Sequence, residues 1–148
     1  MSAVEPRPGI GGMPEPPQVG DHLALDLLNT EARNQGLVVD HWSSGEDVHR
    51  WLRRQGVVPK DGNTPPDLLA RGRDLRAAVR AAVVARKAGG AVDVEPLNAH
   101  LQAYATSPQL QRDAAGVPTM VRMARDDGAA SLLGPVAEAA AQLLVDGD

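Results

Sequence analysis

Hydrophobic positions recur at helical spacing near the start of the chain. Wound at about 100° per residue, residues 20–33 place their apolar and polar side chains on opposite arcs. Asp21 is placed to cap the first turn as an acceptor, and Gly36 is free to take a left-handed conformation that ends the helix. We therefore predict one amphipathic helix with a polar stripe, followed by an extended connector at residues 37–39. The apolar arc comprises Leu23, Ala24, Leu25, Leu27 and Leu28.

A second helix is predicted from about Gly45 to Gln55. Either Ser43 or Ser44 can cap it, and Ser44 has an acidic residue three positions later, as in a capping box. The helix would end at Gly56. Its apolar residues are Val48, Trp51 and Leu52.

Two further helices follow a Pro/Gly-containing break. Thr64 and Pro65 form a strong start signal, an N-cap before proline, for a long helix that continues to Ala88. Asp93 can cap a shorter helix that runs through about Tyr104. The long helix carries a narrow apolar stripe of Leu68, Leu75, Val79, Ala82 and Val83.

The pattern changes to period two after Pro108. Two short runs, 109–113 and 117–123, are separated by Ala-Ala-Gly and predict a β-hairpin. Pro118 lacks a donor N–H, so it belongs on a free edge or at a bulge. A turn at residues 126–128 precedes a last helix with apolar residues at spacings of three and four. These are Leu132, Leu133, Val136, Ala137, Ala140, Leu143 and Leu144.

These elements predict a mainly α fold with about five helices and one small β-hairpin in a single domain. Residues 1–18 are rich in Pro and Gly and bury too little apolar surface to offset their ordering entropy. We expect a disordered tail followed by one domain over residues 19–148. The 148 residues contain no Cys, which excludes disulfides and thiolate metal sites, and no apolar run approaches the ~18 residues of a membrane span. We expect a cytoplasmic protein that does not contact the membrane.

Several segments resemble the ABATE domain, which stands at the N-terminus of CGNR zinc-finger proteins. The resemblance covers roughly residues 19–146 and rests on GDHLALDLLNT at 20–30, the Trp51-Leu52 segment and the apolar repeat at 132–144. It implies a stress-induced transcription regulator. In that family a cysteine-rich treble-clef zinc finger follows the last helix, and this chain ends where the finger would begin. Direct DNA binding is not expected without the finger, and the net charge of -4 argues against broad nucleic-acid binding.

The polar stripe of the first helix is the candidate ligand site. Asp26, Asn29, Thr30 and Arg33 stand at i, i+3, i+4 and i+7, so they could line a cleft together. Asp26 and Arg33 would then fix a polar ligand through charge-assisted hydrogen bonds. The alternative is a solvated or capping face that holds the next loop in place.

A basic row on the long helix is the candidate nucleic-acid contact. Arg73, Arg76, Arg80 and Lys87 could touch phosphates, although such rows are more often the solvent-facing side of a helix. The histidines show no H-x-x-x-H or H-E-x-x-H spacing, so no zinc or other cofactor is expected. The four histidines are His22, His41, His49 and His100.

The sequence favours binding over catalysis. There is no G-x-S-x-G elbow and no cysteine nucleophile, and Asp26 and Glu31 are five residues apart, on different sides of the predicted helix. We expect a ligand-sensing domain that binds an unidentified small molecule near the first helix, and no enzymatic activity. The alternative is a protein-interaction module, such as a homodimer formed through the hairpin edge and the C-terminal helix.

Overall fold

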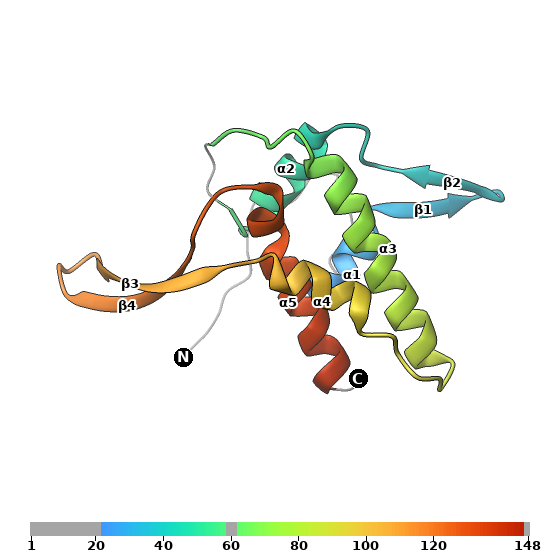
Figure 1. Ribbon diagram of the computed structural model, residues 1–148. Coiled ribbons are helices and arrows are strands. Elements are labelled where there is room, and N and C mark those ends of the chain that lie inside the picture. Colours follow the sequence, from blue (N-terminus) through green and yellow to red (C-terminus); the bar gives the residue numbers. More distant parts are fainter. Residues whose placement is uncertain (1–21, 59–61, 147–148) are drawn as a thin grey trace, which may run out of the picture.

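The computed structural model describes residues 22–58 and 62–146, and the predicted tail and the predicted cap Asp21 lie outside them. The described residues form five helices and two antiparallel two-stranded sheets, which confirms the mainly α class (Figure 1). The helices are α1 (Leu23–Leu28), α2 (Gly45–Arg54), α3 (Leu68–Lys87), α4 (Glu95–Gln102) and α5 (Ala129–Asp146). The strands are β1 (Glu31–Asn34), β2 (Leu37–Asp40), β3 (Thr106–Arg112) and β4 (Pro118–Ala124).

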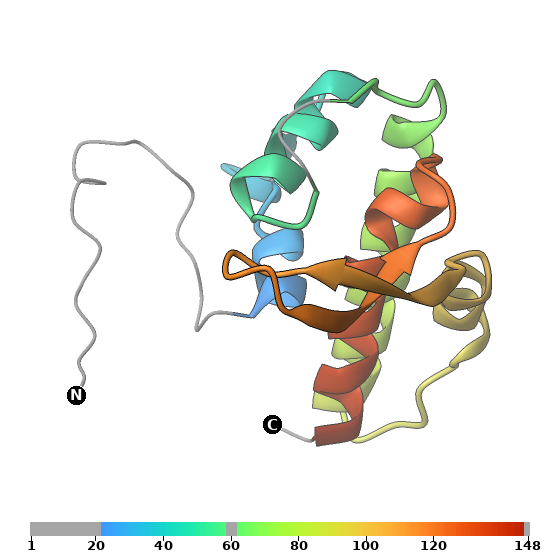
Figure 2. The ribbon, with the colours of Figure 1, turned by 90° about the vertical axis from the view of Figure 1, so that its left-hand side faces the viewer.

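The core lies where α3 and α5 pack side by side, with α1, α2 and α4 around them (Figure 2). The predicted stripe of α3 is confirmed, since Leu68, Leu75, Val79 and Ala82 are buried and Val83 packs against them. On α5, Gly134 allows a close approach, because a Cβ there would lie 2.1 Å from the ring of Tyr104. Within the described residues, no helix has both the length and the apolar character that a bilayer crossing requires.

The first helix is much shorter than predicted. α1 begins after His22, whose Nδ1 accepts from the backbone N–H of Ala24, and it ends at Leu28. Residues 31–40 then form a hairpin instead of more helix and a connector. Gly36 has the expected positive φ, +82°, but it serves with Gln35 (φ +54°) as a two-residue hairpin turn.

The second and third helices form largely as predicted. The side chain of Ser44 caps α2 by accepting from the backbone N–H of Asp47, whose carboxylate accepts from Ser43 N–H. The bond from Ser43 N–H to the carboxylate is the largest cause that lowers the pKa of Asp47, and Arg50 and the Ser44 backbone N–H add to it, against an opposing effect of burial. α3 starts at Leu68, three residues after the predicted Pro65, and ends before Gly89 (φ +80°) as expected.

The second hairpin confirms the period-two prediction. β3 and β4 pair antiparallel, with Leu110 opposite Met120, and Pro118 is the first residue of its strand, where its missing N–H is tolerated. α4 is shorter than expected and ends at Gln102, before Tyr104. The two hairpins project from opposite sides of the helical body (Figure 1).

Candidate binding groove between the first hairpin and α3

The register of the first hairpin places two carboxylates side by side. Glu31 pairs with Asp40 across the strands, so both side chains lie on the same face of the sheet. That face is turned to α3, because arginines of α3 bind both carboxylates. The long arginine side chains of α3 reach across to the hairpin and hold it through these carboxylates.

The centre of this cluster is a two-pronged pair between Arg76 and Asp40. Nη1 and Nη2 of Arg76 donate to the two carboxylate oxygens at 2.9 and 2.6 Å, and Nη1 also donates to the hydroxyl of Thr30 at 2.9 Å. The Arg76 side chain is only 4% exposed. A buried guanidinium needs such partners, because removal from water is costly for an unpaired charge.

The surroundings of Asp40 hold it in its ionised form. Burial raises the pKa of this carboxyl, but the hydrogen bonds from Arg76 and the Trp42 backbone N–H, with the charges of Arg76 and Arg73, outweigh burial. The net effect lowers the pKa of Asp40 to about 2. Asp40 is therefore an anion at neutral pH, which keeps the pair with Arg76 intact.

Trp42 supports the cluster from the core side. The guanidinium carbon of Arg76 lies 4.8 Å from the centroid of the Trp42 ring, in a cation–π arrangement. Trp42 in turn packs edge-on against Trp51 of α2, with 5.7 Å between the ring centroids. Gly72 makes room for this packing, because a Cβ there would lie 3.3 Å from the Trp42 ring.

Arg80 links the second carboxylate to the end of α1. Its Nη2 donates to Glu31 at 2.9 Å and to the carbonyl of Leu28 at 3.3 Å. Thr30 donates its hydroxyl proton to the carbonyl of Leu27 at 2.7 Å. Two carbonyls that end α1 are thus satisfied outside the helix, which explains why the helix can stop at Leu28.

A groove of about 620 Å³ lies along this face of α3. Its polar end is formed by the arginines and carboxylates, and the exposed Val84 belongs to its apolar part. Charge-assisted bonds to carboxylates or phosphates are the chemistry that this arginine set provides. The lining residues are Glu31, Asp40, Arg73, Arg76, Ala77, Arg80, Ala81 and Val84.

The four predicted ligand residues do not share one helix face. Asp26 is buried within α1, Asn29 is the C-cap that follows α1, and Arg33 is exposed on β1. Thr30 is buried and belongs to the cluster through its bond from Arg76. The predicted stripe is wrong as a geometry, because the helix ends before three of its four members.

The predicted basic row divides into two parts. Arg73, Arg76 and Arg80 all line the groove and bind carboxylates, whereas Lys87 is exposed and does not line it. The expectation of a solvent-facing row is wrong for Arg76, whose side chain is buried. Arg73 and Arg80 keep 46% and 42% of their side-chain surface exposed, so both can reach a bound molecule.

Glu31, Asp40 and Trp42 were missed as site residues from the sequence. The signal that could have found them is the β-prone 37–39 segment after Gln35-Gly36. Interpreted as a hairpin with a two-residue turn, this segment would have paired Glu31 with Asp40. The identity of their arginine partners, more than thirty residues away, has no local signal.

The histidines have separate local roles. His22 caps α1, His41 is exposed beside β2, and Nε2 of His100 lies 3.0 Å from the carboxylate of Asp74. Nδ1 of His49 lies 2.9 Å from the hydroxyl of Thr64. Burial, together with the charge of Arg53, lowers the pKa of His49.

Comparison with known proteins gives a family match over most of the chain. The profile of the ABATE family, described as "putative stress-induced transcription regulator", matches residues 21–147. No curated protein and no solved structure matches the chain.

Proposed function

Because the chain belongs to the ABATE family, we propose that it is a regulatory domain that binds a small anionic molecule in the groove on α3. The family's description supports the regulatory role, and the groove supports the ligand. We place this function in the cytoplasm. In this proposal the domain binds without catalysis and without a metal or other cofactor, because ion-paired arginines and carboxylates recognise anions but offer no activated nucleophile.

The main support for the proposal is that arginines of the groove already bind two carboxylates of the protein itself. Arg76 holds Asp40 through two parallel bonds, and Arg80 holds Glu31. A carboxylate or phosphate of a ligand presents the same oxygen geometry. Each guanidinium has five N–H donors, and the exposed Arg73 and Arg80 have only two of these bonds each to the described residues.

The rest of the groove indicates what accompanies the anionic group. Ala77, Ala81 and Val84 continue the lining along α3, and Val84 is 59% exposed. An apolar portion of a ligand would cover this surface. We therefore propose a small carboxylate or phosphate that carries a short apolar chain or ring, a size that a groove of about 620 Å³ accommodates.

Ligand binding can be passed on through the first hairpin. Glu31 lies 2.9 Å from Arg80 and 3.8 Å from Arg76, so a ligand anion would compete with it for the same cations. A ligand shifts an equilibrium only by its differential affinity for two states. Here those states would be the hairpin held on α3 and the hairpin released, which a partner or a zinc finger on another segment could distinguish.

A thermal-shift screen of small carboxylates and phosphates tests this proposal. A ligand that binds only the folded state at a hundredfold excess over its Kd stabilises by about 2.7 kcal/mol. We expect Arg80→Gln to lower the affinity of any hit at least tenfold, since it removes one charge-assisted contact. Lys87→Gln is the matched control, because it removes one positive charge from the same helix outside the groove. Equal effects of the two variants would reject the groove as the binding site.

Self-association is a second candidate, supported by exposed apolar strands. Leu37 is 70% exposed and Leu110 is 71% exposed, each in a two-stranded sheet with open edges. The C-terminal helix contributes less than expected, because Leu133, Val136 and Ala140 are buried inside the domain. Light scattering across a wide concentration range distinguishes the candidates, and a strict monomer would reject this one.

A further inference from the structure

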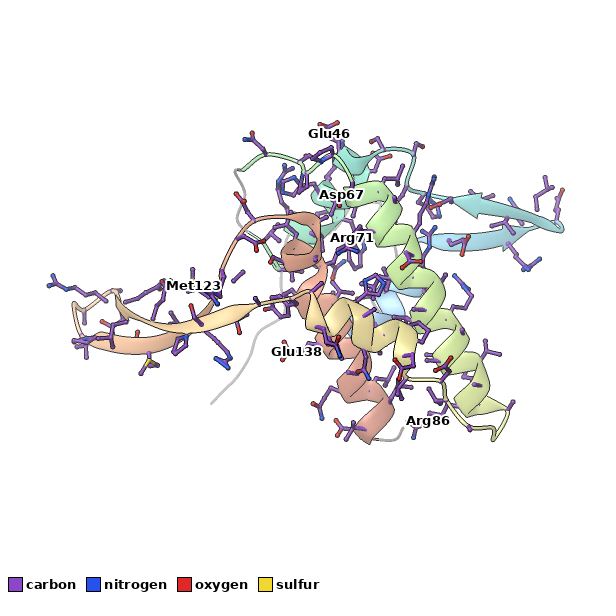
Figure 3. All side chains as sticks on the ribbon, in the orientation of Figure 1. Glu46, Asp67, Arg71, Arg86, Met123 and Glu138 are labelled. Carbon is purple, nitrogen blue, oxygen red and sulfur yellow. The ribbon has the colours of Figure 1, made fainter. Side chains whose placement is uncertain are left out.

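The β3–β4 hairpin, here called the arm (residues 106–124), is separate from the groove and extends away from the helices (Figure 1). Its strands contact chiefly each other. Figure 3 shows its side chains spread into solvent, with Met123 labelled along its length. An isolated two-stranded hairpin is marginally stable in water. The arm therefore adds little to the stability of the fold, which directs attention to a binding role.

One face of the arm is exposed along most of its length. In the centre, Leu110 and Met120 are register partners and are 71% and 69% exposed. Arg112 lies two residues after Leu110 in β3, and Arg122 lies two residues after Met120 in β4, so both are on the same face as the apolar pair. Because the strands are antiparallel, the two arginines lie on opposite sides of that pair, and both are exposed. We call these four residues the outer face. The side chains of the other face are neutral: Ser107, Gln109, Gln111, Thr119, Val121 and Met123.

The charge of the arm differs from that of the chain. The chain has 19 acidic residues and a net charge of -4, yet neither strand of the arm contains a carboxylate. Among the described residues, Arg112 and Arg122 form no ion pair within 4.0 Å. Asp113, at the tip, is committed to the turn, where it accepts from the N–H groups of Ala115 and Val117.

The dimensions of the arm suit the major groove of duplex DNA. Arg122 is opposite Pro108, four residues from Arg112 along the ribbon, which corresponds to about 14 Å at a rise of about 3.4 Å per residue. The major groove is about 12 Å wide and admits a two-stranded ribbon. With the ribbon lying along the groove and the apolar pair towards the bases, the long arginine side chains on either side of that pair can reach the phosphates that border the groove.

We propose that the arm binds duplex DNA by placing its outer face in the major groove. Arg112 and Arg122 contact backbone phosphates, and Leu110 and Met120 contact base edges such as thymine methyl groups. A second copy of the arm is a poorer partner, because it offers no strand carboxylate to either arginine. The proposal departs from the expectation that DNA binding needs a zinc finger. That expectation rested on the missing finger and on the net charge of the whole chain, whereas the two strands of the arm contain arginines and no acidic residue.

Fluorescence anisotropy of the full chain with a labelled mixed-sequence duplex of about 20 base pairs tests the proposal. We expect binding at low salt with a Kd of about 100 µM or tighter, because phosphate-dominated binding has a Kd of about 1 to 100 µM at physiological salt and tightens as the salt concentration falls. The double variant R112Q/R122Q should bind at least tenfold more weakly. Its slope of log K against log salt should fall by about 1.8, or about 0.9 for each lost phosphate contact.

The matched control is R50Q/R71Q, which removes the same total charge from α2 and α3. Arg50 and Arg71 pair with acidic residues of neighbouring turns, and Figure 3 shows Arg71 well away from the arm. We expect this control to retain the affinity within about threefold, since it removes no phosphate contact. Leu110→Ser should weaken binding a few-fold without changing the salt slope, because the lost contact is apolar.

Three outcomes would overturn the proposal. The first is no binding by the unaltered chain at about 100 µM in low salt. The second is an equal loss in both double variants, which would indicate general electrostatic attraction. The third is a dimer that Leu110→Ser dissociates while DNA binding is unchanged, which would assign the arm to self-pairing. None of these outcomes depends on the α3 groove, so failure here and failure of the anion proposal are distinguishable.

Discussion

The two hairpins share a local structure and differ in how they are connected to the helical body. The first, β1–β2, is held by Asp40 and Glu31 on three arginines of α3. The second, β3–β4, contacts chiefly itself and leaves its arginines exposed. A hairpin's role in this fold therefore follows from its carboxylates. With them, the hairpin is held on α3 and encloses a groove, and without them its cations face outward.

Removal of the Asp40 carboxylate should have the largest effect. Asp40→Ala leaves the guanidinium of Arg76, which is 4% exposed, without its main partner. We expect a loss of about 3 kcal/mol in the free energy of unfolding, near the lower end for a broken buried pair, because Thr30 still binds Arg76. Urea denaturation measures this loss.

The matched variant in the second hairpin is Asp113→Ala. It removes an exposed carboxylate that accepts two backbone N–H groups at the turn, so we expect a loss of about 1 kcal/mol or less. Similar losses in the two variants would contradict the idea that only the first hairpin is bound into the fold.

Acid should weaken the attachment of the first hairpin to α3. The pKa of Asp40 is about 2 in the folded chain, against 3.8 for an unperturbed aspartate, so the folded state binds fewer protons. Its stabilisation, about 2 kcal/mol, is present above about pH 4 and is lost as the pH falls through about 2. Asp40→Asn removes this titration. The difference in unfolding free energy between the two proteins should therefore shrink from pH 5 to pH 2, and a constant difference would contradict the assignment.

The turn of the first hairpin should give the smallest effect. Gln35 has a φ of +54°, a conformation that costs most L-residues about 1 kcal/mol, and Gly36 follows at +82°. Asn is the preferred residue at the first position of this turn type. Gln35→Asn should raise the free energy of unfolding by about 0.5 kcal/mol, measured by thermal denaturation. Gln111→Asn, in β3 of the other hairpin, has no such turn to relieve and should not stabilise.

Much of the fold could be predicted from local pattern. The cap at Ser44, the apolar stripe of α3 and the alternation of β3 and β4 depend on neighbours within a few residues, and all three are confirmed. The family assignment also came from local sequence, because the matching segments are runs of adjacent residues. The helical fold and the regulator family were therefore available without coordinates.

The candidate site was not available in the same way. The polar residues of 20–33 fit a helical stripe, but α1 ends at Leu28. The carbonyl of Leu28 accepts a hydrogen bond from Arg80 of α3, which is 52 positions away in the sequence. That partner allows residues 31–40 to form a hairpin instead. The basic row was recognised as a row, yet its burial depended on carboxylates that only the hairpin register brings to it.

Local sequence is enough to specify which segments are helical or extended, because periodicity, caps and turn residues act over a few positions. Three features depend on the packed fold: the position at which α1 ends, the burial of Arg76, and the exposure of Arg112 and Arg122. Each of these depends on which charges meet across the fold. Coulombic and hydrogen-bond partners are chosen by distance in space, and a linear pattern does not record that distance.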